Sequence, residues 1–173
     1  MTTSADAESQ EEALTPVFRE LGKALFIAQQ FESNLLFLVA LLSGKDGKLD
    51  AETFARGVED HIELTLGRLA KAFKIKLNFP SDFEDFIREG VTTRNQIVHG
   101  YVQRNSEKLR TAVGRLQVTD ELKDTQWVLE QRRIFTEQTL DRILEIFGGS
   151  KQKLRDQVNA EFNEDLLRHI TRH

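Results

Sequence analysis

The chain has 173 residues, of which 39% are hydrophobic and 30% charged, a balance typical of one globular domain rather than of a disordered protein. It contains no cysteine, which excludes disulfides, thiolate catalysis and cysteine-ligated metal sites. Its 24 basic and 28 acidic residues give a formal net charge of −4, and the four acids within the first 13 residues account for the whole excess. We therefore expect a disordered acidic tail over residues 1–13 and a single domain over residues 14–173.

Targeting and membrane signals are the next feature to consider. The first 13 residues contain no lysine or arginine and do not resemble a signal peptide. No uninterrupted apolar run approaches the roughly 20 residues that a membrane-spanning helix needs. These observations predict a soluble, cytoplasmic protein without membrane contact.

The first predicted helix begins at Thr15 and Pro16, because threonine is a favoured N-cap residue and proline fits the first helical turn. It ends near Leu42, before a glycine-containing stretch. Apolar residues at helical spacing form one stripe along it: Leu14, Val17, Phe18, Leu21, Leu25, Ala28, Leu35, Leu36 and Val39. Glu32 falls in the middle of this stripe, where a charge is unfavourable unless it has a partner.

Two further helices are predicted before residue 104. The second runs from near Asp50 to near Phe73, and its short connection to the first helix implies an antiparallel hairpin. The sequence Ser81-Asp82-Phe83-Glu84 is a capping box, so a third helix begins there and ends between about Val98 and Gln103.

Arg94 lies at the centre of the apolar stripe of the third helix, as Glu32 does in the first. A buried charge without a partner costs several kcal/mol, so both side chains need one. The simplest arrangement packs the two helices together and joins these residues by a salt bridge of about 4 Å or less. The alternative is that one or both charges face a groove or a subunit interface and stay hydrated.

The remaining elements are harder to assign. Residues 104–135 mix β-branched, aromatic and basic residues, and they predict short strands or an ordered, partly extended excursion rather than a long helix. Thr136 is predicted to cap a final helix, which continues past Gly148-Gly149 either as one interrupted helix or as two helices meeting at Ser150. The sequence thus predicts an all-α fold, an up-and-down bundle of four to five helices with the excursion at residues 104–135.

The segment Arg94-Asn95-Gln96-Ile97-Val98-His99-Gly100-Tyr101 carries the residues best suited to chemistry. Asn95 and His99 are four residues apart and share one side of a helix, so the amide can hydrogen-bond the imidazole and fix its tautomer. Arg94 lies about 140° from His99 on an ideal helix. If both bind one phosphate, then the helix breaks near Gly100, the long arginine reaches round, or a second protomer supplies one of the two groups.

This segment resembles the Arg-Asn-x-x-x-His motif of the HEPN superfamily, and more narrowly the Arg-x4-His-x-Tyr form of HEPN toxins. A long first helix containing Glu32, a helical hairpin and the motif in a later helix agree with the resemblance, which covers roughly residues 14–103 and the final helix. It implies an HEPN-like bundle and a metal-independent endoribonuclease that acts as a homodimer. Arg94 and His99 of two protomers would then face a shared cleft, with Asn95 as a third catalytic residue and with Glu32 and Tyr101 in support.

The residue types fit this chemistry. A neutral histidine can take the proton of a 2′-hydroxyl, or as a cation it can protonate the 5′-oxygen that leaves. An arginine can hold the phosphate and stabilise the charge that develops on it. The other histidines, His61, His169 and His173, are scattered, so no metal and no cofactor is expected.

The resemblance also implies partners. In HEPN toxins the tyrosine that matches Tyr101 can be adenylylated by a nucleotidyltransferase antitoxin, so such an antitoxin is a candidate partner and a role as a toxin or in phage defence a candidate function. The competing hypothesis is a non-catalytic HEPN module that dimerises and binds RNA or a protein partner without cutting RNA.

A local excess of positive charge follows the motif. Between Arg88 and Arg115 there are six basic residues against two acidic ones, a net charge of +4. Four of the six come after the motif and are predicted to bind the RNA backbone on the approach to His99: Arg104, Lys108, Arg110 and Arg115. The alternative is a solvated surface of scattered cations.

Overall fold

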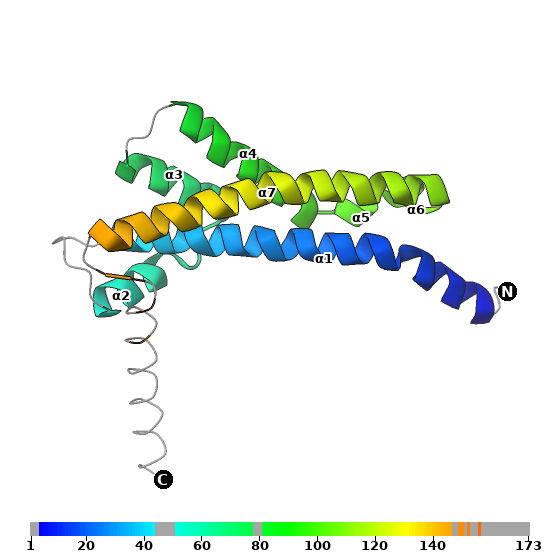
Figure 1. Ribbon diagram of the computed structural model, residues 1–173, viewed down its shortest axis with the longest axis horizontal. Coiled ribbons are helices and arrows are strands. Elements are labelled where there is room, and N and C mark those ends of the chain that lie inside the picture. Colours follow the sequence, from blue (N-terminus) through cyan, green and yellow to red (C-terminus); the bar gives the residue numbers. More distant parts are fainter. Residues whose placement is uncertain are drawn as a thin grey trace, which may run out of the picture. The chain divides into compact units, whose positions relative to one another are not determined.

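The computed structural model describes residues 4–43, 51–77, 81–146, 149, 150, 152 and 156. Within these residues every regular element is a helix, which confirms the predicted all-α class. The helices are α1 (Ser4–Leu41), α2 (Ala51–His61), α3 (Leu66–Leu77), α4 (Ser81–Val98), α5 (Tyr101–Arg104), α6 (Ser106–Leu109) and α7 (Ala112–Ile146), as labelled in Figure 1.

The chain divides into two compact units, each built from two separate segments. Unit 1 comprises Met1–Ser33 and Phe79–Ile134, and unit 2 comprises Asn34–Asn78 and Phe135–His173. The long helices α1 and α7 therefore contribute residues to both units. The single domain expected over residues 14–173 stays a prediction.

The N-terminal helix is longer than the sequence predicts. It begins at Ser4, not at Thr15, so the predicted disordered tail is corrected for residues 4–13. This stretch is rich in alanine and glutamate, which favour helix. Thr15 does not cap; its hydroxyl donates to the carbonyl of Glu11 at 3.0 Å. Pro16 lies inside α1, which bends in its N-terminal part (Figure 1). Proline has no backbone N–H to donate to the preceding turn, so a helix can bend where it occurs.

The second predicted helix is in fact two helices. The backbone leaves helical geometry between His61 and Leu66, so the prediction of one helix from near Asp50 to near Phe73 was wrong. Thr65 lies just before α3. A threonine hydroxyl can hydrogen-bond to the backbone nearby, which favours threonine at the start of a helix over the middle of one. The carbonyl of Thr65 then accepts the first amides of α3, from Arg68 at 2.8 Å.

Unit 2 packs α2 closely against the end of α1. A Cβ atom on Gly57 would lie 2.8 Å from the carbonyl oxygen of Ala40, so only glycine permits this approach. The rings of Phe37 and Phe54 meet at 5.6 Å between centroids. The hydrophobic core of this unit includes Leu38, Val39, Leu66, Leu69, Phe73, Leu140 and Leu144.

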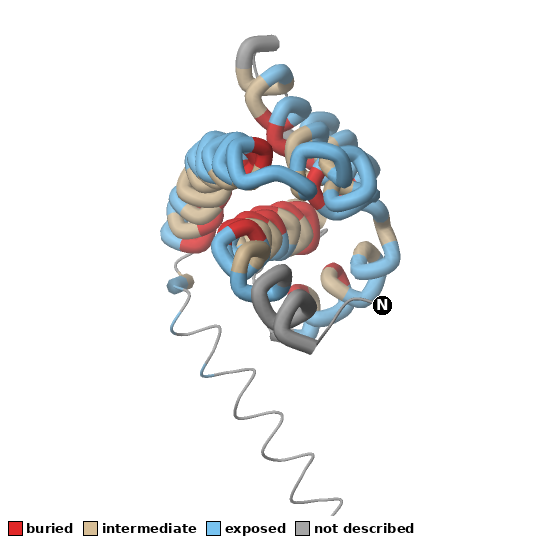
Figure 2. The backbone as a smooth tube through the Cα atoms, turned by 90° about the vertical axis from the view of Figure 1, so that its right-hand side faces the viewer, coloured by how far each residue is buried: buried red, intermediate tan, exposed pale blue. Residues whose placement is uncertain are grey.

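Unit 1 brings together α1, α4 and α7. In this unit α1 and α7 lie side by side and run in the same direction (Figure 1), and Gln126 donates to the carbonyl of Glu20 at 2.9 Å. Buried and exposed positions alternate along the helices, as one-sided packing requires (Figure 2). The core comprises Val17, Ala24, Ala28, Phe31, Ile87, Ile97, Val118, Leu122 and Leu129.

The predicted extended excursion at residues 104–135 was wrong, because this stretch contains α6 and most of the 35-residue helix α7. The buried positions of α7 do recur at helical spacing, but polar residues interrupt them: Arg132 and Thr136 are buried. In addition, Trp127 is 65% exposed, so an aromatic residue that suggests a strand or a core lies on the outer side.

Thr136 does not cap a final helix; it is fully buried inside α7. The side-chain amide of Asn34 donates to its hydroxyl at 3.3 Å, which satisfies part of the hydrogen-bonding capacity of a buried polar group. The apolar positions predicted beyond Gly148-Gly149, such as Leu154 and Phe162, lie outside the described residues.

Candidate functional site

Glu32 of α1 and Arg94 of α4 form the predicted salt bridge. The Nη2 atom of Arg94 lies 2.7 Å from Oε2 of Glu32. The two side chains are 19% and 30% exposed, so the pair is largely but not completely removed from water. The prediction made from two charges in apolar stripes is confirmed.

Asn95 contacts the arginine and not the histidine. Its side-chain oxygen accepts a hydrogen bond from Nη1 of Arg94 at 3.2 Å. In the part of the chain that the structure describes, no hydrogen bond joins the amide of Asn95 to the imidazole of His99. The tautomer-fixing contact expected at this spacing is therefore absent there, and Asn95 instead helps Glu32 to orient the guanidinium.

Helix α4 breaks at the motif, one of the three solutions that the sequence left open. Val98 is its last residue, and Gly100 has a φ of 72° and a ψ of 24°. This left-handed conformation is readily available to glycine and strained for other residues. His99 is exposed at the turn, and its backbone N–H still donates to the carbonyl of Asn95 at 3.0 Å.

Arg104 folds back over this turn. Its backbone N–H donates to the carbonyl of Gly100 at 3.0 Å, and its guanidinium donates to the carbonyls of Gln96 and His99. These carbonyls lie at the C-terminal end of α4, where the helix offers no partners of its own. The predicted RNA-binding residue Arg104 is thus engaged with the backbone of the motif.

Tyr101 opens the one-turn helix α5 and presents a buried hydroxyl. The phenol oxygen has no hydrogen-bond partner among the described residues. Burial raises the pKa of Tyr101 above its usual value, and the nearby carboxylate of Glu121 adds to this rise. The phenol is therefore held in its neutral form.

The other three predicted RNA-binding cations also have partners within the chain. Lys108 lies 2.6 Å from a carboxylate oxygen of Glu121, and Arg110 is 3.4 Å from Glu107. Arg115 donates to the carbonyl of Leu109 at 3.1 Å. The pair formed by Arg110 is the most exposed of these contacts, so its guanidinium is the easiest of the three to release.

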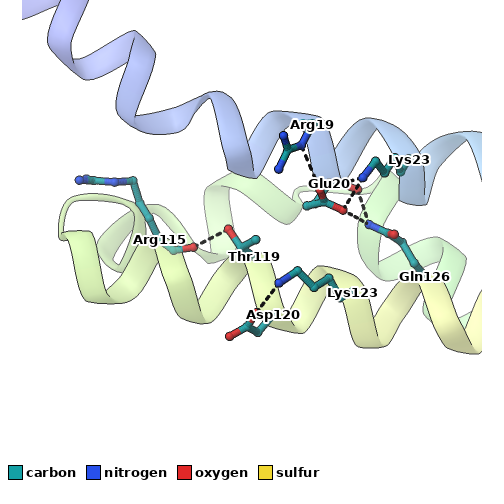
Figure 3. Close-up of polar contacts among 8 residues, drawn as sticks. All are labelled: Arg19, Glu20, Lys23, Arg115, Thr119, Asp120, Lys123 and Gln126. Carbon is teal, nitrogen blue, oxygen red and sulfur yellow. Dashed lines mark hydrogen bonds and ion pairs between the residues drawn. The ribbon is translucent and has the colours of Figure 1, made fainter.

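Sequence reasoning missed a second charged cluster, centred on Glu20 (Figure 3). The carboxylate of Glu20 is only 6% exposed, and it accepts hydrogen bonds from Arg19 at 3.1 Å, Lys23 at 2.9 Å and Gln126 at 3.0 Å. The predicted apolar stripe did not include this position. Val17, Glu20, Ala24 and Ala28 share the buried side of α1, whereas Phe18, which the stripe included, is 49% exposed.

These contacts make folding stability dependent on pH. The hydrogen bond from Gln126, followed by that from Lys23, lowers the pKa of Glu20 from 4.5 to about 2. A lowered pKa means that the contribution of Glu20 is complete above pH 4.5 and is lost as the pH falls towards about 2. In urea unfolding, the stability advantage of the wild type over Glu20→Gln should therefore shrink across this window.

The matched control for this experiment is Asp120→Asn. Asp120 pairs with Lys123 at 2.8 Å in the same region (Figure 3), but its side chain is 72% exposed. We expect this variant to follow the wild-type pH dependence closely, because exposed pairs contribute little. A wild type and a Glu20→Gln variant that lose stability in parallel between pH 5 and pH 2 would contradict the assignment.

In the described part of the chain, no group of three or more histidine, aspartate or glutamate side chains is arranged to hold a metal ion.

Over Glu11–Leu41, α1 is long and apolar enough to cross a membrane by length and composition, although 44% of its most apolar 18-residue stretch is buried within the protein. A core helix passes the same test, so the absence of membrane contact stays a prediction.

The geometry thus joins Glu32, Arg94 and Asn95 in one contact group and places an exposed His99 on the turn that follows. Arg104 is attached to that turn, while Lys108, Arg110 and Arg115 are paired further along the chain. Comparison of the chain with protein-family models, with curated proteins and with solved structures gives no match.

Proposed function

We propose that this protein is a metal-independent endoribonuclease of the HEPN type, built on an HEPN-like bundle and acting as a homodimer. The observation that carries the proposal is an exposed histidine, His99, at a defined turn five residues after an arginine whose guanidinium is held by Glu32. Such an arrangement supplies one group that can transfer protons and one fixed positive charge.

The reaction is a transesterification within RNA. His99 takes the proton of a 2′-hydroxyl, and the 2′-oxygen forms a bond to the adjacent phosphorus. The bond from phosphorus to the 5′-oxygen breaks, and that oxygen receives a proton from an imidazolium. The products are a 2′,3′-cyclic phosphate and a 5′-hydroxyl, so no water and no oxidant is consumed.

Arg94 is suited to the phosphate because its donors are only partly used. A guanidinium has five N–H donors, and the described contacts of Arg94 engage one Nη2 donor with Glu32 and one Nη1 donor with Asn95. The remaining donors can bind phosphate oxygens while these two residues fix the plane of the group. We therefore assign Glu32 and Asn95 the role of orienting Arg94.

A homodimer accounts for the angular separation of the two catalytic side chains. Arg94 lies in α4 and His99 lies beyond its end, and two copies related by a two-fold axis would each supply one of them to a shared phosphate. Arg110 and Arg115 would then contact the RNA backbone beyond the cleft. Adenylylation of Tyr101 has less support, since the phenol oxygen is buried.

The test is cleavage of a single-stranded RNA in the presence of EDTA. We expect the wild-type protein to cut and to leave 2′,3′-cyclic phosphate and 5′-hydroxyl ends, identified by end-group labelling and mass spectrometry. The Arg94→Ala and His99→Ala variants, purified in parallel, should cut far more slowly. Activity that disappears in EDTA and returns with Mg²⁺ would refute the metal-independent mechanism.

A second function has a specific observation in its favour. The side chain of Arg94 is 19% exposed and ion-paired, as a purely structural arginine would be. This favours a non-catalytic HEPN-like module that binds RNA or a protein partner. RNA binding in a gel-shift assay without cleavage, and unaltered by His99→Ala, would support this second function against the first.

A further inference from the structure

The turn between α4 and α5 is held by one side chain. The guanidinium of Arg104 donates hydrogen bonds to two carbonyls of the preceding segment, those of Gln96 and His99. The backbone N–H of the same residue donates to the carbonyl of Gly100. A Cβ atom on Gly100 would lie 3.4 Å from Nη1 of Arg104, so the side chain passes close over the glycine. The loop from Gln96 to Arg104 is therefore closed by three hydrogen bonds from a single residue.

Arginine is the residue type that can make this bridge. Its planar fork presents two Nη groups that can reach separate acceptors, whereas a lysine ammonium is a compact point charge on a flexible stem. The left-handed conformation of Gly100 leaves carbonyls at the end of α4 without helical donors. A cation at a helix C-terminus also interacts favourably with the helix dipole.

We propose that Arg104 is a positioning residue for His99, fixing the backbone from which the imidazole projects. This inference rests on the proposed ribonuclease function and assigns Arg104 a role different from contact with RNA phosphates. His99 is the first residue after α4 and is exposed, so few side-chain contacts restrain it. The hydrogen bond from Arg104 to the backbone carbonyl of His99 restrains this residue in place of burial.

The proposal predicts a particular kinetic pattern in the full-length protein. Arg104→Ala and Arg104→Lys should each lower kcat for RNA cleavage about tenfold, because a displaced general acid–base loses rate steeply with misalignment. KM and the salt dependence of RNA binding should stay at wild-type values, since no phosphate contact is lost. The matched control is Arg88→Ala, which removes an exposed arginine of α4 that is ion-paired with Asp85 and has no role in the proposed site.

A structural measurement keeps the test independent of activity. Hydrogen–deuterium exchange of the backbone amides of His99 and residue 104 should accelerate in both Arg104 variants and stay unchanged in Arg88→Ala. Thermal unfolding should move little, since Arg104 is exposed and contacts only the local turn. This combination separates a local release of the turn from general unfolding.

The outcomes divide clearly. Faster exchange together with a loss in kcat supports the proposal, and faster exchange in a protein whose wild type cuts no RNA supports the bridge while refuting the ribonuclease function. Unchanged exchange overturns the bridge. A raised KM with a flatter salt slope, or full rescue of kcat by lysine, overturns positioning and assigns Arg104 to phosphate binding or to simple electrostatics.

Discussion

Replacing His99 by alanine should lower the rate of RNA cleavage about 10²–10⁴-fold, the range expected for the loss of one general acid–base group. The imidazole is exposed, so its removal leaves no cavity and no stranded polar group. Unfolding free energy should therefore stay within about 0.5 kcal/mol of the wild-type value. Single-turnover kinetics with a labelled RNA, together with urea unfolding, measures both quantities.

The control for this variant is Gln103→Ala, which removes another exposed side chain of the same turn region. It should retain wild-type cleavage. Cleavage by His99→Ala at the wild-type rate would mean that the nuclease activity comes from another site or from a contaminant, and it would remove the basis for the proposed mechanism.

Replacing Glu32 by alanine should destabilise the protein by about 1–3 kcal/mol, because it strands a guanidinium that is largely withdrawn from water. The expected loss lies between that of an exposed pair and that of a fully buried one, since the two side chains keep 19% and 30% of their exposure. Urea unfolding of Glu32→Ala, Arg94→Ala and the double variant gives the coupling energy directly.

Glu107→Ala is the matched control, because it breaks an ion pair of similar residue types whose side chains are 74% and 81% exposed. Its unfolding free energy should change by less than about 0.5 kcal/mol. A Glu32→Ala variant as stable as the wild type, or a double-mutant cycle with no coupling, would show that the contact adds nothing to stability.

The Glu32–Arg94 pair could be predicted because each charge occupied a position where its helix requires an apolar residue. The end of α4 was predicted only as a range, between about Val98 and Gln103, with a break near Gly100 as one of three alternatives. The left-handed conformation of Gly100 is the feature that makes the break. The local pattern was sufficient for the ion pair, because that constraint acts between two amphipathic helix faces.

Other features depend on contacts that no local pattern encodes. The part of α7 before Thr136 was missed, because Arg132 lies on its buried side. There the guanidinium stacks 4.1 Å from the centroid of the Phe86 ring and donates to the carbonyl of Phe86. The hydrogen bonds of Arg104 to the backbone were missed for a related reason. A run of basic residues in a sequence suggests RNA binding, but the sequence does not show which carbonyls or carboxylates each side chain contacts. Burial and pairing of long cationic side chains are decided by tertiary structure.

The order of segments in unit 1 has a consequence for synthesis of the protein. Its first segment ends at Ser33, but the α7 residues that cover it extend to Ile134. At about 5–20 residues per second, a ribosome needs roughly 5–20 s to make the intervening chain. The side of α1 that α7 covers stays open during this interval, so we expect it to be accessible to a chaperone that acts on nascent chains. Neither unit can therefore be completed until the ribosome has made most of α7.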